Sequence, residues 1–176
     1  YYEASLSSFS KSRATRVMNT LNMTWQIMEH LELSGNFTFT KDFNKFDQYI
    51  SFKSEYFSDL PLDSAELAGQ YKIRRENTTI YEEDLVLNYS NQFDRHNLNV
   101  SLGIHGYAAK DYSDNYIGVG LPSDHMDYIS FAKTYAFNTR PGGREAFDRL
   151  FSGYLSGSYN FDQRYGVDVS LRADKS

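Results

Sequence analysis

The sequence predicts an all-β fold, namely an antiparallel up-and-down transmembrane β-barrel segment of about six to eight strands. Apolar and polar residues alternate along stretches of about ten residues, the length that a tilted strand needs to cross a bilayer. Short and long connections between these stretches alternate strictly, as the turns and outer loops of outer-membrane barrels do. The chain is also rich in aromatic residues, with 15 Tyr and 13 Phe among 176 residues.

The first predicted hairpin covers residues 16–40. Its first strand places Thr and Asn side chains on one face and apolar side chains on the other. The apolar positions are Val17, Leu21, Met23, Trp25 and Ile27. The second strand continues the alternation from Leu31 to Thr40, after a short polar turn at 28–30. A long outer loop is then expected over residues 41–77.

The second predicted hairpin covers residues 78–108 and shows the alternation best. One face of its second strand carries Leu98, Val100, Leu102 and Ile104. The opposite face carries Asn97, Asn99, Ser101 and His105. A short turn at 94–96 joins the two strands, and a second long outer loop is expected over residues 109–149.

The third predicted hairpin covers residues 150–174, with its turn at 161–163. Ten residues of strand rise about 33 Å, and a 45° tilt leaves roughly 23 Å, close to the apolar band of such barrels. Together the three hairpins and two long loops make residues 1–176 one partial barrel domain. The polar faces would line a wet or protein-filled lumen.

Aromatic residues collect beside the short turns. They are Trp25, Phe93, Tyr159, Phe161 and Tyr165. Rings at the level of the lipid headgroups form a girdle at the membrane edge of β-barrels, and we expect these five to do so. The alternative is that they are ordinary strand aromatics that fill a core.

Open sheet edges are a difficulty for a sheet of six to eight strands in lipid. Unpaired backbone groups there cost several kcal/mol each, so more strands are required to close the barrel. The chain also begins without an initiator Met and stops directly after a strand pattern. We therefore expect a mid-barrel fragment of a longer protein, with any plug domain absent from this chain.

Composition excludes several other classes. No stretch has the roughly 18 apolar residues of a transmembrane helix, and mean hydropathy is −0.60. The absence of cysteine excludes disulfide scaffolds and thiolate metal sites, and a net charge of −5 without a basic block argues against nucleic-acid binding. The four histidines do not have metal-ligand or catalytic spacing. We expect no enzyme activity, no catalytic residues, no cofactor and no metal site.

The loop at 109–149 is the best candidate for contact with a ligand or partner. Aromatic faces beside polar groups suit sugar rings, peptides or a partner that covers the barrel. The candidate residues are Tyr112, Tyr116, His125, Tyr128, Tyr135 and Arg140. The alternative is a loop that buries its aromatic side chains within its own fold.

Three segments resemble the SusC/RagA-type TonB-dependent transporters of Bacteroidetes outer membranes. The run from 150 to 165, LFSGYLSGSYNFDQRY, continues into VSLRADKS at 169–176 and resembles a mid-barrel hairpin of that family. Lys175 stands where the family usually has Gly. The hairpin from 85 to 103, with NYSNQFDRHNLNV around its turn, and the run RVMNTLNMTWQI at 16–27 also resemble family strands.

The resemblance implies a function. It implies a 22-stranded barrel with an N-terminal plug, energised by TonB through a part of the protein absent here. It also implies a SusD-like surface lipoprotein as partner and import of oligosaccharides or peptides across the outer membrane of a Gram-negative bacterium. Other partners would be outer-membrane lipid and the remainder of the barrel. Two alternatives stay open, a soluble carbohydrate-binding β-sandwich and a passive porin-type barrel.

Overall fold

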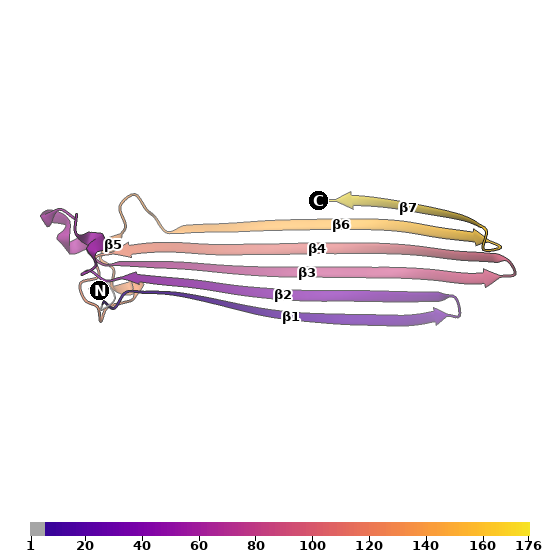
Figure 1. Cartoon of the computed structure of the whole chain (residues 1–176), viewed down its shortest axis with the longest axis horizontal. Coiled ribbons are helices and arrows are strands. Elements are labelled where there is room, and N and C mark those ends of the chain that lie inside the picture. The colour runs from indigo at the N-terminus through magenta and orange to yellow at the C-terminus, as the bar shows by residue number, and fades with distance from the viewer. Residues whose placement is uncertain (1–5) are drawn as a thin grey trace. The chain divides into compact units, whose positions relative to one another are not determined.

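The computed structural model describes residues 6–176. Six long strands lie side by side in the order β1, β2, β3, β4, β6, β7 (Figure 1). The strands are β1 (Phe9–Met28), β2 (Leu31–Ile50), β3 (Gln70–Phe93), β4 (His96–Val119), β6 (Gly142–Phe161) and β7 (Tyr165–Lys175). The two-residue strand β5 (Thr134–Tyr135) pairs with β4 off this path.

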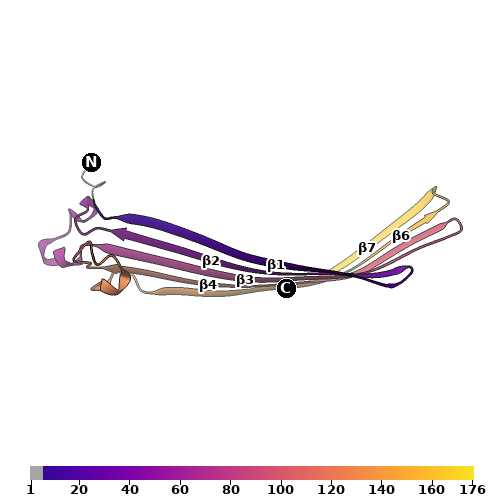
Figure 2. The same ribbon diagram turned by 90° about the horizontal axis from the view of Figure 1, so that it is seen from below.

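The predicted fold class is confirmed, because neighbouring strands in the sequence pair antiparallel in one up-and-down sheet. Within residues 6–176 there is no second sheet, so the described residues do not form the two packed sheets that the β-sandwich alternative requires. Figure 2 shows the same strands turned by 90° about the horizontal axis. In the described part of the chain, no helix has the length and apolar character needed to cross a membrane.

Three tight turns join β1 to β2, β3 to β4, and β6 to β7. Asp94 in the second turn, and Asp162 and Gln163 in the third, adopt positive φ angles of 53°, 52° and 52°. Asp tolerates the left-handed conformation better than most residues, because its short polar side chain forms local hydrogen bonds. The register of β6 and β7 follows from the last turn, with Leu155 opposite Leu171.

The strands extend further toward the long connections than the sequence pattern indicates. The connections cover residues 51–69 and 120–141, whereas loops were expected over 41–77 and 109–149. The alternation fades in these extensions because their side chains face water or a small local core, so no continuous apolar face is needed. Polar pairs join the strands there instead. Asp42 accepts hydrogen bonds from Arg16 at 2.6 and 2.9 Å, and Thr78 donates to Asp111 at 2.5 Å.

The chain forms two compact units. The loop unit comprises residues 6–16, Asp42–Thr78 and Asp111–Ala146, and the wall unit comprises Val17–Lys41, Thr79–Lys110 and Phe147–Ser176. The cluster of buried apolar side chains lies in the loop unit. The wall unit instead exposes its apolar face, for example Leu171 with 63% of its surface accessible. An apolar face of this extent is larger than a monomer in water usually exposes.

Candidate functional site

The surface of the loop unit is formed mainly by two connections. The first, residues 51–69, contains two 3-10 helices, η2 (Glu55–Phe57) and η3 (Leu62–Leu67). The second, residues 120–141, contains η4 (Ile129–Phe131) and β5. Both connections are therefore partly structured.

Two glycines allow the connections to approach each other closely. Gly69 and Gly120 have φ angles of +85° and +79°, which favour glycine, and a Cβ on Gly69 would lie 2.6 Å from the carbonyl oxygen of Leu121. The Gly120 N–H donates to the carbonyls of Leu67 and Gly69 at 3.1 and 3.0 Å. The Leu121 N–H donates to the carbonyl of Ala68 at 3.0 Å. These bonds join the two connections through their backbones.

A small aromatic core lies beneath these connections. Tyr49, Tyr71, Ile73 and Leu121 are buried together, so strands β2 and β3 and the second connection all contribute. The Phe9 ring packs against the rings of Tyr49 and Tyr71, with centroid distances of 5.9 and 6.1 Å. This core supports the loop surface from below.

Asp124 fastens the second connection to the end of β2. Its carboxylate accepts hydrogen bonds from the hydroxyls of Ser51 at 2.6 Å and Tyr49 at 3.0 Å, and both donors are fully buried. The Lys53 ammonium lies 3.7 Å from the other carboxylate oxygen. The Ser51 bond, helped by Tyr49 and Lys53, lowers the pKa of Asp124 although burial opposes it. Burial and the bond to Asp124 raise the pKa of Tyr49 to about 12.

The six candidate residues of the outer loop lie in different settings. Tyr112 and Tyr116 are in β4, His125 and Tyr128 are in the second connection, Tyr135 is in β5, and Arg140 lies shortly before β6. Tyr116 packs against the aromatic core, and the Tyr128 ring lies 5.9 Å from that of Tyr71. Tyr112 and Tyr135 are 42% and 51% exposed. Two of the tyrosines thus support the loop fold, while contact with a ligand stays a prediction for all six.

A groove of about 530 Å³, here called the outer groove, opens between the two connections. It is lined by Phe52, Ala65, Ala68, Gly120, Pro122 and Phe131. Its charged members, Lys133 and Glu66, form an ion pair at 2.5 Å. The groove is therefore mainly apolar, with a paired charge at its edge.

Several exposed apolar side chains of the loop unit were not among the predicted site residues. Leu62 and Phe137 are 96% and 91% exposed, and Tyr56 and Phe131 are 66% and 50% exposed. No periodic pattern marks them, because an apolar residue in a connection has the same sequence signature whether it is buried or exposed. The two phenylalanines belong to the aromatic residues of the predicted loop at 109–149, although they were not among its candidate contact residues.

The polar face of the wall unit forms a second candidate surface. Side chains of neighbouring strands bond across it, including Asn36 to Asn22 at 3.1 Å and His105 to Asp84 at 2.8 Å. Further pairs are Thr20 with Thr38, Ser101 with Asn88, Ser90 with Asn99, and Arg172 with Ser152. These bonds satisfy polar groups along the face and leave a hydrophilic surface suited to contact with water or with polar solutes.

Three of the five predicted girdle residues, Phe93, Tyr159 and Phe161, lie around His96. His96 stacks on Phe93 at 5.3 Å and lies 5.0 Å from the Phe161 ring. Its Nδ1 is 2.6 Å from the hydroxyl of Tyr159. Trp25 and Tyr165 are 59% and 71% exposed. Position at a membrane edge stays a prediction, and His96 is a member of this cluster that the pattern did not reveal.

Solved structures share this fold. A chain of the RagAB peptide importer in the "closed-closed" state matches with a TM-score of 0.76 and 19% identity, over 94% of this chain and 18% of that chain. A structure of the RagAB peptide transporter gives 0.77 and 20%, with the same coverage. The siderophore receptor PiuA from Acinetobacter baumannii gives 0.54 and 12%, over 95% of this chain and 26% of that chain. No protein-family model and no curated protein matches the sequence.

The chain spans less than a fifth of the RagAB chains that it matches. At these identities the likeness concerns the fold. It agrees with the resemblance of three sequence segments to SusC/RagA-type transporters. The chain therefore has the fold of a wall segment of a TonB-dependent transporter barrel.

Proposed function

We propose that the chain forms part of the barrel wall of a TonB-dependent nutrient importer in the outer membrane of a Gram-negative bacterium. The observation that carries this proposal is the two-faced wall unit. One face exposes apolar side chains, among them Leu21, Leu85 and Leu171, and the other face bears hydrogen-bonded polar side chains. The matched structures with known roles are transporters and receptors, which supports import rather than catalysis.

The outer groove and the loop tyrosines would then face the outside of the cell. We infer that this surface contacts imported solute or a SusD-like lipoprotein that covers the barrel. Peptides are the favoured solute, because the matched RagAB chains are described as a peptide importer, and oligosaccharides are the alternative. The rest of the barrel, a plug and TonB would be supplied by other parts of the protein and the cell, as in a SusC/RagA-type system of Bacteroidetes.

Cysteine labelling tests the placement of the two faces. The chain itself has no cysteine, so single substitutions in β4 are made in a version of the full protein from which any other cysteine has been removed. We expect Asn99→Cys and Ser101→Cys to react with a small water-soluble maleimide in isolated outer membranes. Val100→Cys and Leu102→Cys should react only after detergent extraction and denaturation, because lipid covers them. Equal labelling of all four positions in intact membranes would refute the barrel-wall proposal.

Uptake assays test the loop surface. We expect Tyr112→Ala combined with Tyr135→Ala to reduce uptake of a fluorescently labelled tryptic digest, since both side chains are exposed. Labelled maltodextrins serve as the oligosaccharide probe. The control is Tyr165→Ala at the opposite turn. Unchanged uptake of both probes would exclude a ligand role for these two tyrosines, and uptake that continues without TonB would favour the porin-type alternative.

A further inference from the structure

A groove of about 420 Å³, here called the basic groove, lies across β1, β2 and β3 in the loop unit. Its lining includes Ser12 of β1, Asn44 and Phe46 of β2, and Lys72, Arg74 and Glu76 of β3. Most of the lining comes from β2 and β3, and each of these strands has a neighbouring strand on both sides. The setting of the groove is therefore fixed mainly by the interior of the sheet rather than by its edges.

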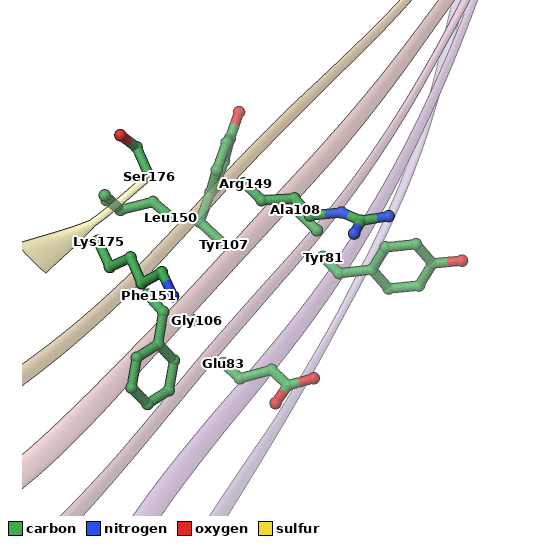
Figure 3. Close-up of a pocket in the computed structure, with 10 residues that line it drawn as sticks. All are labelled: Tyr81, Glu83, Gly106, Tyr107, Ala108, Arg149, Leu150, Phe151, Lys175 and Ser176. Atoms are coloured by element: carbon green, nitrogen blue, oxygen red, sulfur yellow. The ribbon is translucent and has the colours of Figure 1, made fainter.

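The charged side chains of β3 share one face of that strand. Lys72, Arg74 and Glu76 stand at alternate positions, and alternate side chains of a strand point to the same side. Figure 3 shows this alternation further along β3, where Tyr81 and Glu83 extend to the same side of the ribbons. The strand thus presents two cations and one anion in a row along the groove.

The aromatic core of the loop unit holds the opposite face of β3. Tyr71 and Ile73 occupy the positions before and after Lys72, and both are buried in that core. Closely packed side chains leave the backbone that carries them little freedom to shift. The spacing between the cations of the groove is therefore set by a strand that the core holds in place.

The cations of the groove are only partly compensated by carboxylates. Lys45 pairs with Asp47 at 2.8 Å, and Arg74 pairs with Glu76 at 2.5 Å. Lys72 is half-buried, and its ammonium forms no hydrogen bond or ion pair with any of residues 6–176. The Arg74 side chain is 61% exposed, so the guanidinium N–H groups that do not face Glu76 are open to solvent. The groove therefore offers charged donors to an anion.

We propose that the basic groove binds acidic side chains of an extended peptide during import. Alternate residues of a strand lie about 7 Å apart, and an extended peptide spaces its own alternate side chains equally. Lys72 and Arg74 therefore match two carboxylates that are two positions apart in such a peptide, and they bind them through charge-assisted hydrogen bonds. Asn44 adds an amide donor and Phe46 an apolar contact. This inference rests on the proposed function, in which the loop unit meets the solute.

Peptide binding by the purified full-length protein in detergent tests the proposal. The probe is a short fluorescent peptide with glutamate at alternate positions and an amidated C-terminus, and fluorescence anisotropy measures its affinity. We expect Lys72→Gln with Arg74→Gln to weaken binding about tenfold or more, because two charge-assisted bonds are lost. Lys72→Arg with Arg74→Lys keeps both charges and should retain most of the affinity. A peptide with glutamine in place of glutamate should bind weakly, even with a free C-terminal carboxylate.

Two further variants separate the groove from the net charge of the protein. Arg13→Gln with Arg75→Gln also removes two charges, but these residues stand at alternate positions from Phe9 and Ile73 and so lie on the core side of their strands. We expect this control to leave affinity unchanged. Glu76→Gln should strengthen binding about two- to fivefold, because it frees the Arg74 guanidinium and removes a repelling charge.

Three results would contradict the proposal in different ways. Unchanged binding in the double Gln variant would overturn it, and so would an equal loss in the control, which would show that only net charge matters. Displacement of the probe by oligogalacturonate at lower concentrations than by unlabelled glutamate peptide would overturn the peptide assignment in favour of acidic sugars. If cysteine labelling confirms the two faces while these variants leave peptide binding unaffected, the basic groove alone fails and the barrel-wall proposal stands.

Discussion

Replacing Asp124 by alanine should release the second connection of the loop unit from the end of β2. The substitution removes the acceptor for two buried hydroxyls, those of Ser51 at 2.6 Å and Tyr49 at 3.0 Å. A hydrogen bond to a charged group contributes about 1.5 to 3 kcal/mol, and a buried donor without partner costs about 1 to 3 kcal/mol. Because the hydroxyls can rotate toward water once the loop moves, we expect a net loss of about 3 kcal/mol.

Hydrogen exchange measures this loss locally. The amides of Gly120 and Leu121 bond to the first connection, so they report on separation of the two segments. A loss of about 3 kcal/mol corresponds to roughly a hundredfold faster exchange if local opening limits the rate. Asp127→Ala, three positions further along, is the matched control, because the Asp127 side chain has no bonded partner among residues 6–176. Equal exchange in the Asp124 variant and the control would refute the anchoring role.

Acid should reproduce the effect of the substitution without any mutation. The hydrogen bonds that the Asp124 carboxylate accepts lower the pKa of Asp124 in the folded chain. A lowered pKa means that the stabilisation is complete above the unfolded pKa near 3.9 and is lost as pH falls through the folded value. We therefore expect protection of the Leu121 amide to decline only below about pH 4. A decline centred between pH 5 and 7 would point to another group.

Three further predictions concern other parts of the chain. The pKa of Tyr49 is raised to about 12, so Tyr49 should ionise at higher pH than an ordinary tyrosine in an alkaline absorbance titration, and Tyr49→Phe should remove one tyrosine from that high-pH step. The stabilisation that the Tyr49 hydroxyl contributes is complete below the unfolded pKa near 10 and is lost as pH rises toward 12. Gly103→Ala should cost about 1 to 3 kcal/mol, because a tyrosine ring of β6 occupies the space of a Cβ there, whereas Gly153→Ala has open space and should be nearly neutral in urea unfolding. Leu155→Arg on the apolar face should cost about 2 to 4 kcal/mol in vesicles, and Ser156→Arg on the polar face should cost far less.

The sequence predicted the strands best where lipid and water impose different demands on the two faces. Leu98 to Ile104 alternate with polar residues, and this stretch lies within β4 as expected. Outside the apolar band the same strand continues through Tyr112 and Tyr116 to Val119. No alternation is required there, so the period of two could not locate the true strand ends.

The loop residues were harder to assign, because their environment depends on contacts between distant segments. Tyr128 packs against Tyr71 of β3, 57 positions earlier. Asp124 bonds to Tyr49 in β2 and to Ser51, which directly follows β2. No local pattern reveals such partners. The aromatic content of the loop could be read from the sequence, but the division between supporting and exposed rings required the fold.

Two glycines of the wall unit have a consequence for how the barrel assembles. Gly35 of β2 is covered by Leu85 of β3, and Gly103 of β4 is covered by Tyr154 of β6. These strand pairs are the ones joined by long connections, so no tight turn dictates their alignment. A shift by two residues along either strand would keep the correct faces but would bring the covering side chain against a residue that has a Cβ.

The covered glycines thus help to set the register of the strand pairs that lack hairpin turns. Tight turns set the alignment within each hairpin, and the glycine contacts set it between hairpins, once on each face of the sheet. A misaligned strand pair would be disfavoured sterically at these two points. Each later hairpin of the wall is therefore aligned with the preceding hairpin by one glycine contact.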